Sequence, residues 1–589
     1  MSAVDLLRAE LTRVARSLGA PDGVEPLLER PRDPAFGDWA TNVALVLAKP
    51  LSKKPRDLAQ AIVKELDFSR AGIRAADIAG PGFINFRVDV NVVARGIAGL
   101  IDAADQYGRS DVGEGRHVNV EFVSANPTGP LHVGHGRQAA LGDAIASLLE
   151  WTGWRVTREF YYNDAGAQIE NLALSVWMRA AEELGESVRL PRIAYHGDYI
   201  RDIAERYLSA HRDERRVESI RNGARSLSAA AAEMEQAADD AEVASIRVRA
   251  LASLDHDLFE ELRRFAVQEL RKEQDRDLQA FGVKFDVYYL ETSLYTDRRV
   301  DDTVRRLVAA GHTYEKDGAL WLRTTDFGDD KDRVMRKSAE RGGDYTYFVP
   351  DVAYHVGKWE RGFRRAIDVQ GADHHSTVTR VHVGLQALEM GIPRGYPEYV
   401  LHQMVTVMKG GEEMKISKRA GSYVTVRDLV DEVGRDAVRY FFLMRKGDSQ
   451  LVFDVDLARS QSEDNPVYYI QMAHARMCGI FRVGGIDPAT IRAGDADFDV
   501  LSLPEEHELM KSLLDFPALI AGAADALEPQ RVATYLHETA AKVHLWYHKA
   551  HVLNEPEPIM RARLVLARAA QVVLRNGLSV LGINAPERM

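Results

Sequence analysis

Cysteine is almost absent from this chain of 589 residues, in which Cys478 stands alone. A single thiol cannot form a disulfide within the chain, and it cannot supply a zinc site built from several cysteines. We therefore expect no zinc and a reducing, cytoplasmic location.

Long apolar runs are also missing. No stretch is long enough to span a bilayer as a helix. The first 20 residues form a charged, amphipathic pattern without the apolar core of a signal peptide. The sequence therefore favours neither a membrane protein nor an exported one.

The chain has no excess of positive charge. Its formal net charge is −12, which excludes a protein that attracts nucleic acid over its whole surface but leaves room for a local basic patch. The hydrophobic fraction of 46% and the charged fraction of 28% are those of a globular protein. At this length the chain is too long for one core, so we expect a multidomain α/β protein.

Three regions differ in their patterns. Residues 1–112 predict a small N-terminal α+β domain that ends with the alternating strand FINFRV. Residues 113–455 alternate strands with helices, which predicts a Rossmann-like, doubly wound parallel sheet. Within them, about 165–285 is helical and charged, and too long for an ordinary crossover, so we interpret it as a helical insertion.

Strand signals largely disappear after residue 455, and residues 456–589 predict a C-terminal all-α helix bundle. One helical stripe of this bundle is expected to lie in the core and consists of Val532, Tyr535, Leu536, Val543, Trp546 and Tyr547.

The segment HVGHGRQAALGDA follows a predicted strand and a turn rich in proline and glycine. It has helical spacing, which places His132 and His135 in the first turn of a helix and on one face. The N–H groups and dipole of a helix start favour phosphate, and Gly134 and Gly136 would let a ligand approach the backbone. Taken alone, the pattern fits a helix start with incidental polar residues better than a binding site.

A second polar segment, Lys415-Ile416-Ser417-Lys418, follows the apolar run MVTVM. Two lysines in a loop can neutralise a polyphosphate as its charge redistributes, although such a pair alone is more often only solvated. Together, HVGH and KISK in one α/β domain resemble the HIGH and KMSKS signatures of class I aminoacyl-tRNA synthetases.

Longer motifs narrow this resemblance to bacterial arginyl-tRNA synthetases, with the extra N-terminal domain of that family. The motifs that carry it are FGDWATNVAL, GPGFINFRV, EFVSANPTGPLHVGHGR, NDAGAQIENLALSV, YHGDYIRDIA, GADHH, KISKRAG, NPVYYIQMAHAR and APERM. The resemblance implies a ligase that activates L-arginine with ATP and Mg²⁺ to arginyl-adenylate and pyrophosphate. It then transfers arginine to the 3′ end of tRNA(Arg). Such enzymes commonly need tRNA before activation, and they usually act as monomers.

The resemblance also implies roles for residues around ATP. His132 and His135 would contact the reacting phosphate, and Lys415 and Lys418 the departing pyrophosphate. The other expected ATP-binding residues are Gly134, Gly371, Asp373 and Ser417. Gly371 and Asp373, in GADHH, would hold the ribose, and the alternative for Asp373 is a helix N-cap. We interpret His374 and His375 as structural.

Recognition of arginine requires carboxylates that face the guanidinium group and an aromatic or hydroxyl wall. The resemblance assigns this task to Tyr347 and Asp351, which would lie one turn apart on a helix that begins after Pro350. It adds three further arginine contacts, Glu121, Asn126 and His132, and Gln370 is a weaker candidate. Without the resemblance, an edge segment with packed tyrosines explains DYTYFVPDVAYH equally well.

The tRNA-binding surface is less evident. The C-terminal bundle resembles the anticodon-binding domain of the family, and the N-terminal domain would contact the tRNA elbow. Arg476 and His474 are weak candidates for tRNA contacts, and Tyr468 fits the core equally well. Three alternative functions remain open, namely another class I synthetase, a nucleotidylyltransferase with the same HxGH site, and an inactive tRNA-binding paralogue.

Overall fold

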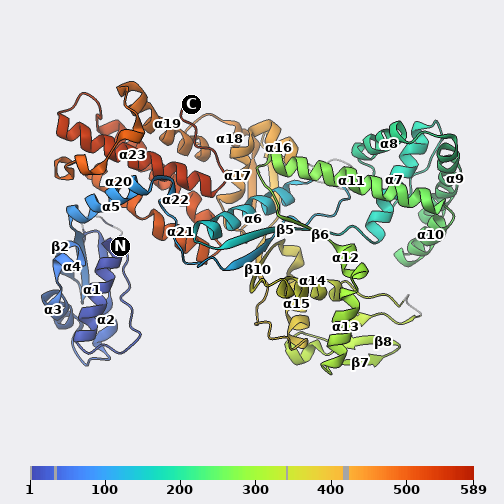
Figure 1. The fold of residues 1–589 in the computed structure, drawn as a ribbon, viewed down its shortest axis with the longest axis horizontal. Coiled ribbons are helices and arrows are strands. Elements are labelled where there is room, and N and C mark those ends of the chain that lie inside the picture. Colours follow the sequence, from blue (N-terminus) through green and yellow to red (C-terminus); the bar gives the residue numbers. More distant parts are fainter. Residues whose placement is uncertain (1–2, 32, 34–35, 340–342, 415–423) are drawn as a thin grey trace.

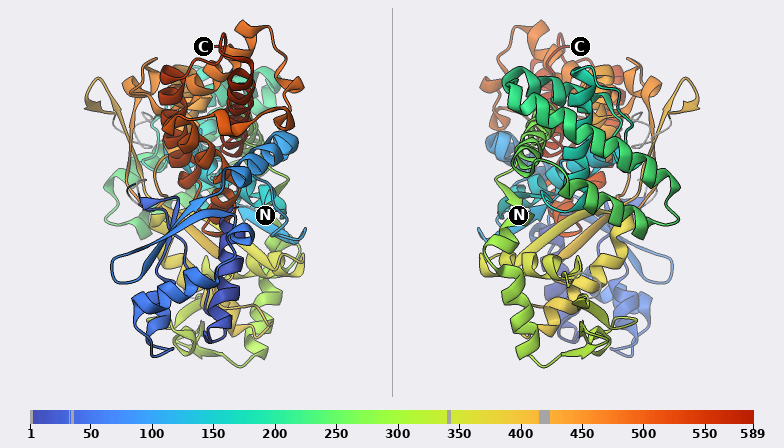
Figure 2. Two further views of the ribbon diagram at one scale, coloured as in Figure 1. Left: turned by 90° about the vertical axis from the view of Figure 1, so that its left-hand side faces the viewer. Right: turned by 90° about the vertical axis from the view of Figure 1, so that its right-hand side faces the viewer.

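The computed structural model describes residues 3–31, 33, 36–339, 343–414 and 424–589. Figure 1 shows an elongated molecule with a parallel sheet at its centre, a helical lobe at one end, and an N-terminal module beneath a helix bundle at the other. Figure 2 gives the same arrangement from the two ends. None of the described helices combines the length and apolar character needed to cross a membrane.

The N-terminal module combines an antiparallel sheet of order β1-β3-β2 with four helices around one apolar core. Pro55 begins a helix at the position where its missing N–H group costs nothing. The small α+β domain that the sequence predicted is therefore present. Its elements are α1 (Ala3–Ser17), β1 (Trp39–Thr41), α2 (Val43–Ala48), α3 (Pro55–Glu65), α4 (Phe68–Ala71), β2 (Ile73–Ala79) and β3 (Phe83–Val88).

The central sheet has five parallel strands in the order β11-β10-β4-β5-β6. They are β4 (His117–Glu121), β5 (Arg155–Tyr162), β6 (Val287–Leu290), β10 (Arg365–Gly371) and β11 (Glu398–His402). The chain winds in one direction from β4 to β6 and in the other from β10 to β11. The predicted doubly wound sheet is confirmed, and its switch point, where ligands bind in such folds, lies between β4 and β10.

Helices cover both faces of this sheet. The most enclosed is α6 (Val133–Trp151), which packs so closely on the end of β4 that a Cβ atom at Gly142 would lie 2.1 Å from the Phe122 ring. The other elements of this region are α5 (Val90–Ala103), α12 (Glu291–Thr296), α13 (Arg299–Ala309), β7 (Thr313–Lys316), β8 (Ala319–Leu322), β9 (Arg333–Arg336), α14 (Phe348–Glu360), α15 (His375–Ala387), β12 (Val405–Lys409), β13 (Glu412–Glu413) and β14 (Leu451–Asp454).

The segment interpreted as an insertion forms a helical lobe with its own apolar core. Its helices are α7 (Ala167–Glu183), α8 (Asp198–Ala210), α9 (Glu214–Gln236), α10 (Asp240–Ala252) and α11 (His256–Ala280). The alanine-rich stretch spans the end of α9 and the start of α10. The long helix α11 returns from this lobe to the sheet (Figure 1).

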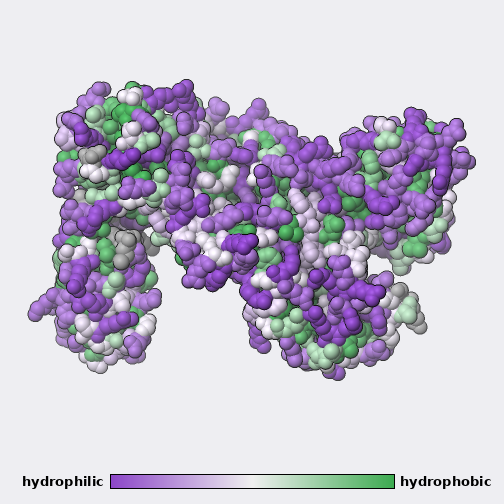
Figure 3. Space-filling view, viewed as in Figure 1, coloured by the Kyte–Doolittle hydropathy of each residue, from purple (hydrophilic) through white to green (hydrophobic). Residues whose placement is uncertain are grey.

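Helices α16 (Val426–Val433) and α17 (Arg435–Leu443) precede β14. After residue 455 the regular elements of the described residues are all helical, as expected, and the α-helices are α18 (Val455–Arg459), α19 (Pro466–Gly484), α20 (Pro504–Leu514), α21 (Phe516–Asp525), α22 (Gln530–Lys549) and α23 (Glu557–Val580). The predicted core stripe on α22 is buried except for Tyr547, which is 41% exposed. Hydrophilic residues cover most of the face in Figure 3, in keeping with the composition.

Candidate active site

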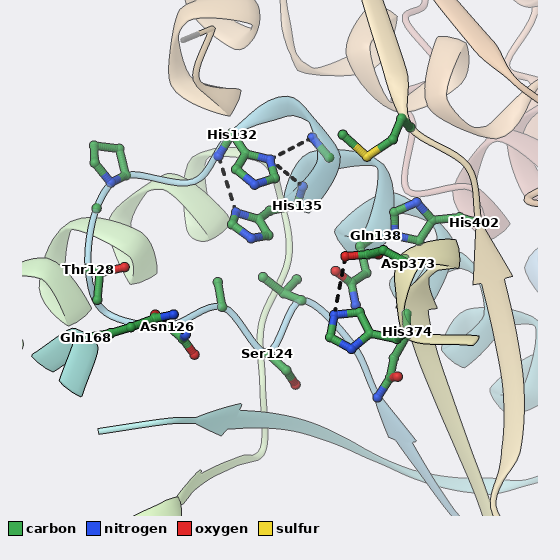
Figure 4. Close-up of a pocket in the computed structure, with 18 of the residues that line it drawn as sticks. Ser124, Asn126, Thr128, His132, His135, Gln138, Gln168, Asp373, His374 and His402 are labelled. Atoms are coloured by element: carbon green, nitrogen blue, oxygen red, sulfur yellow. Dashed lines mark hydrogen bonds and ion pairs between the residues drawn. The ribbon is translucent and has the colours of Figure 1, made fainter. Parts of the chain in front are cut away.

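The two histidines of HVGH cap helix α6. His132 is the N-cap residue, and its Nδ1 atom accepts hydrogen bonds from the backbone N–H groups of Gly134 (3.1 Å) and His135 (3.4 Å). The Nδ1 atom of His135 accepts from the N–H group of His132 at 3.3 Å, and the rings stack with centroids 3.7 Å apart (Figure 4). A nitrogen that accepts an N–H group carries no proton, so each neutral ring is protonated on Nε2. Both histidines thus have the tautomer that donates to an anion at the helix start.

The segment that follows KISK pairs with the HVGH segment. The N–H group of Val133 donates to the carbonyl of Val424 at 3.3 Å, and Val426 donates to Leu131 at 2.9 Å. Lys415, Ser417 and Lys418 lie outside the described residues. The described residues 424–426, which follow the KISK segment, pair with residues 131–133, almost 300 residues earlier in the sequence.

Gly136 serves this contact rather than a ligand. A Cβ atom at Gly136 would lie 2.8 Å from Val426 and 2.9 Å from Phe442. The expectation that Gly136 leaves space for a ligand is therefore wrong, because helices from the C-terminal side of the chain occupy that space. Gly134, by contrast, lines the cavity described next.

A cavity of about 530 Å³ opens beside the histidines at the switch point of the sheet (Figure 4). Its walls include residues that follow β4, β10 and β11 and residues of the helical insertion. They include Ser124, Asn126, Thr128, His132, Gly134, His135, Gln168, Tyr195, Tyr199, Gln370, Gly371, Asp373, His374 and His402. The structure therefore brings most residues of the predicted ATP site, and Asn126 of the predicted arginine site, to one cavity.

The GADHH segment differs in detail from its prediction. Asp373 is exposed and lies 3.7 Å from His374, and the short helix at Ala372–His374 is capped by Gly371, so Asp373 is not an N-cap. His374 and His375 are exposed, and His374 lines the cavity. Neither histidine is therefore part of a buried core, and His374 is in reach of a ligand in the cavity.

Two buried acceptors at this cavity have no hydrogen-bond partner among the described residues. They are Oε1 of Gln370 and Nε2 of His402. The Nδ1 atom of His402 lies 3.2 Å from the carbonyl oxygen of Gln403, so it is the ring's donor and Nε2 is the acceptor. Burial lowers the pKa of His402 to about 4, which keeps the ring neutral at physiological pH. The site thus offers unsatisfied acceptors to a ligand that carries N–H groups.

The turn after β4 is strained. Val123 and Ser124 have φ angles of 69° and 40°, in the left-handed region that residues other than glycine seldom occupy. The Ser124 hydroxyl group donates to Glu121 Oε1 at 2.9 Å and accepts from the N–H group of Tyr161 at 3.2 Å. Strain of this kind costs about 1–3 kcal/mol and is found mainly where function requires a particular geometry. Here it directs the following loop, with Asn126, to the cavity.

Beneath this turn lies a buried ion network. Lys358, which is fully buried, places its Nζ atom 2.6 Å from Glu121 Oε2 and 2.7 Å from Asp368 Oδ1. Glu121, His355 and Asp368 have the spacing of a metal site, with ligand atoms within 4.8 Å of one another. The ammonium group of Lys358 already bridges the two carboxylates, so this cluster is an ion network in its own right. Burial opposes ionisation of Asp368, but Lys358 and His355 lower its pKa to about 2.

A second pair of acidic groups lies along α14 and α12. Asp351, on the first turn of α14, accepts no side-chain hydrogen bond from any described residue. Burial raises the pKa of its carboxyl group to about 7, an effect that His355 opposes and that Glu291 and Glu121 reinforce. Glu291 is 8% exposed and accepts from the Tyr161 hydroxyl group at 3.0 Å. Two carboxylates with few compensating cations form a site suited to a cationic group.

Tyr347 is the N-cap residue of α14 and is 80% exposed. Its carbonyl accepts the N–H group of Asp351 at 3.4 Å, so the two residues lie one turn apart, as predicted. The helix begins before Pro350 rather than after it, because proline is tolerated in the first turn, where N–H groups have no partner within the helix.

Comparison with known proteins places all three regions of the chain. Residues 97–461 match the family model of the class I (R) tRNA synthetase catalytic domain, residues 4–88 the arginyl tRNA synthetase N-terminal domain, and residues 470–589 the DALR anticodon binding domain. The arginine–tRNA ligase of Geobacter metallireducens is 54% identical over 567 residues, which cover 96% of this chain and 95% of that protein. The chain belongs to the arginyl-tRNA synthetase family.

Other proteins named as arginyl-tRNA synthetases are also similar to this chain. The arginine–tRNA ligase of Bordetella petrii is 54% identical over 575 residues, which cover 97% of this chain and 96% of that protein. The structure of the Thermus thermophilus arginyl-tRNA synthetase is 22% identical, with a TM-score of 0.74 and full coverage of both chains. It shows that the fold is shared. Family membership also excludes two alternatives, another class I synthetase and a simple nucleotidylyltransferase.

The residues of the motif NPVYYIQMAHAR that were considered for tRNA contacts have different surroundings in the structure. Arg476 lines a cavity of about 640 Å³ between α19 and α22, close to the ring of Tyr547 at 5.6 Å. His474 is 2% exposed, and its ring contacts the carbonyl oxygen of Pro586 at 2.9 Å, so it faces the interior. Tyr468 is half-buried.

Several residues of the site were not predicted from the sequence. Glu291 directly follows strand β6, and His402 is the last residue of β11. Because ligands bind at the carboxyl ends of parallel strands, this rule could have identified both positions. Tyr195 and Tyr199 occur in the motif YHGDYI but reach the cavity only through the fold of the insertion, for which the sequence gives no signal.

Proposed function

We propose that the cavity at the switch point is where this chain carries out the arginine–tRNA ligase reaction. A carboxylate oxygen of arginine attacks the α-phosphorus of ATP, the bond to the β-phosphate oxygen breaks, and arginyl-adenylate and pyrophosphate result. A hydroxyl group of the terminal tRNA nucleoside then attacks the arginyl carbonyl group and releases AMP. The observation that supports this most is the backbone pairing of the HVGH segment with Val424 and Val426, beside the cavity. The carboxyl groups of Asp351 and Glu291 do not line this cavity, and they act on each other electrostatically.

On the ATP side, the Nε2–H groups of His132 and His135 would stabilise charge on the α-phosphate, because capping fixes both tautomers. Lys415, Ser417 and Lys418 would hold the departing pyrophosphate. Gly134 and Gly371 would allow ATP to approach the backbone, and Asp373 would accept from the ribose hydroxyl groups. The acceptor Nε2 of His402 suits the amino group of adenine.

Mg²⁺ fits this site as a partner of ATP. It binds phosphate oxygens, water and carboxylates, and Asp373 supplies an exposed carboxylate among the described residues that line the cavity. When bound, Mg²⁺ would neutralise phosphate charge. The burial, tautomers and positions of the residues that line the cavity do not depend on Mg²⁺.

On the arginine side, Asp351 and Tyr347 would hold the guanidinium group, with Glu291 as a further acceptor. Asn126, which donates to Gln168 at 2.7 Å in the cavity wall, would contact the α-amino or carboxylate end. Both oxygens of Glu121 already have partners, Ser124 on one side and Lys358 on the other. Glu121 would therefore support the arginine site by fixing the Ser124 turn.

The raised pKa of Asp351 predicts how arginine binding depends on pH. Guanidinium binding requires the ionised carboxylate, so a pKa of about 7 makes the KM for arginine rise by about tenfold between pH 8 and pH 6. Asp351→Asn should abolish this slope and raise the KM about 10- to 100-fold at pH 8, the cost of a charge-assisted hydrogen bond. The measurement is arginine-dependent pyrophosphate exchange across this pH range. The exposed Asp317→Asn variant is the control and should behave as wild type, whereas a pH-independent KM in the wild type would contradict the assignment.

For tRNA, we propose that the N-terminal module contacts the elbow of tRNA(Arg) and that the C-terminal bundle binds the anticodon. Arg476 is the better of the two candidate contacts, because it lines a surface cavity while His474 is buried. We further propose that the enzyme acts as a monomer in the cytoplasm and requires tRNA before it activates arginine. Ordering of the cavity by tRNA would then be a form of induced fit.

Pyrophosphate exchange with each standard amino acid, with and without tRNA(Arg), tests the proposal. We expect exchange with arginine, and only in the presence of tRNA. Exchange with another amino acid would refute the assignment of Asp351 and Tyr347. Absence of any exchange in a folded chain that binds tRNA would instead support the inactive paralogue.

A further inference from the structure

The helical insertion is joined to the active site by the inner end of α11. This helix begins in the insertion lobe and ends beside the central sheet (Figure 1). Two side chains one turn apart on it, Gln274 and Asp277, are almost fully buried, with exposed fractions of 1% and 7%. Each contacts a chain segment that flanks one of the two ATP motifs.

Gln274 holds the turn that precedes HVGH. Its Nε2 group donates to the carbonyl oxygens of Asn126 at 3.2 Å and Gly129 at 2.8 Å. Its Oε1 atom is buried and has no hydrogen-bond partner among the described residues. The reverse orientation of the amide would place this oxygen against two carbonyl oxygens, so the orientation is fixed by chemistry. Burial of an unsatisfied oxygen atom destabilises the fold. The presence of Gln274 here therefore indicates that its two hydrogen bonds to the turn are important.

Two other helices of the insertion hold the same turn. The Tyr199 hydroxyl group of α8 donates to the carbonyl oxygen of Thr128 at 2.8 Å. Gln168 of α7 accepts from the side chain of Asn126 at 2.7 Å. The turn contains Pro127 and Pro130, which have no N–H groups, so it can form few backbone hydrogen bonds of its own. Its shape therefore depends on side chains from the insertion.

Asp277 holds the segment that follows KISK. Its Oδ1 atom accepts from Nε of Arg427 at 3.0 Å, and Arg427 also donates to the carbonyl oxygen of Arg276 at 3.2 Å. Arg427 is the second residue of α16, immediately after the residues that pair with the HVGH segment. One end of one helix therefore contacts both segments that flank the ATP motifs.

We propose that Gln274 and Asp277 are positioning residues through which the helical insertion sets the geometry of the turn before HVGH relative to the start of α16. This inference rests on the proposed function of the cavity. Neither side chain lines the cavity, so both act through the residues that they hold. Displacement of a catalytic group by about 1 Å can slow a reaction about 100-fold, so their loss should reduce the rate more than arginine binding.

The test compares Gln274→Met with Gln279→Met in the full-length chain. Met keeps the length of Gln274 but removes its donor. Gln279 is exposed on the same helix, and its side chain donates to Asp275. In Gln274→Met we expect the kcat of pyrophosphate exchange to fall about 10- to 100-fold, with the KM for arginine changed less than about threefold. Gln279→Met should match the wild type. A kcat of Gln274→Met within twofold of the wild type would overturn the proposal.

Hydrogen exchange supplies a readout that does not require activity. Amides of residues 124–136 should exchange faster in Gln274→Met than in Gln279→Met, while the insertion core remains protected. Unchanged exchange in this segment would overturn the inference, whatever the activity. If the wild type itself does not activate arginine, the proposed function fails, and hydrogen exchange still decides whether Gln274 holds the turn.

Gln274→Glu adds a pH-dependent signature. An ionised carboxylate cannot donate to the two carbonyl groups, but a protonated one can donate to one of them. Relative to the wild type, both the kcat and the protection of residues 124–136 should therefore recover as the pH is lowered. Gln274→Met should show no such recovery, and equal profiles of the two variants would contradict a role for the donor.

Discussion

Replacement of His135 by Asn is expected to lower the kcat of arginine-dependent pyrophosphate exchange about 100- to 1000-fold, with little loss of thermal stability. Asn places its Oδ1 atom where His135 has Nδ1, so the hydrogen bond from the N–H group of His132 can persist. What disappears is the Nε2–H group, the donor to the reacting phosphate. Removal of one such donor to developing charge costs about 100- to 1000-fold in other enzymes.

His135→Gln is the matched variant, because it retains a donor near the position of Nε2 and loses the acceptor that caps the helix. We expect a smaller loss of rate than in His135→Asn, together with a loss of stability of about 1 kcal/mol, the usual cost of a lost cap. Rates and melting temperatures of both variants are measured with tRNA(Arg) present. A wild-type rate in His135→Asn, together with a loss of rate and stability in His135→Gln, would show that His135 acts only as a cap and would refute its role as a donor.

These variants separate two functions that one residue combines. A histidine that caps a helix through Nδ1 has its protonation site fixed by the backbone, without a carboxylate neighbour to orient the ring. His132 also accepts backbone N–H groups through Nδ1, so both histidines present an Nε2–H donor at the positive end of α6. The sequence predicted both histidines on one face at the start of the helix, and the structure shows that they occupy the N-cap and N3 positions of a capping box.

Much of the architecture could be predicted because it depends on local patterns. Strand, turn and helix follow one another at His117–Trp151 as the apolar spacing indicates, and the helical insertion is marked by its length and composition. The cavity could be located for the same reason, since residues that follow parallel strands meet at one edge of a sheet. The roles within it depended on family resemblance, because HVGH or KISK alone fits an ordinary helix start or a solvated loop.

The contacts that shape the cavity could not be predicted, because they join residues that are distant in the sequence. Gln274 and Asn126 are 148 residues apart, and Tyr354 and Glu121 are 233 apart. A buried glutamine on a charged helix has no distinguishing pattern in the sequence. The acidic character of the arginine side could not be predicted either. The pKa of Asp351 is raised by burial and by Glu291 and Glu121, which belong to other strands and helices.

The buried network beneath the cavity predicts the largest effect on stability. Lys358→Met should destabilise the catalytic sheet by about 3–5 kcal/mol, because it leaves Glu121 and Asp368 buried, close together and without their shared cation. Met fills a similar volume, so loss of packing contributes little. Because the chain is multidomain, the measurement is hydrogen exchange of β4 and α14 peptides rather than one global unfolding transition.

Lys409→Met is the control, because Lys409 pairs with Glu432 at the surface, where removal of a charge has little effect. Asp368→Asn in the Lys358→Met background should restore part of the lost protection, since it removes one of the two uncompensated charges. Wild-type protection of β4 in Lys358→Met, or no recovery in the double variant, would contradict this account.

The same network determines whether the stability of the catalytic sheet rises or falls with pH. The pKa of Asp368 is lowered to about 2, below its ordinary value, because Lys358 and His355 outweigh its burial. A group whose pKa is lower in the folded state adds stability above its unfolded pKa, and this contribution is lost as the pH falls toward the folded value. We therefore expect the protection of β4 to decline between about pH 4 and pH 2 in the wild type. In Lys358→Met the decline should be absent or reversed, because protonation of Asp368 then relieves repulsion from Glu121.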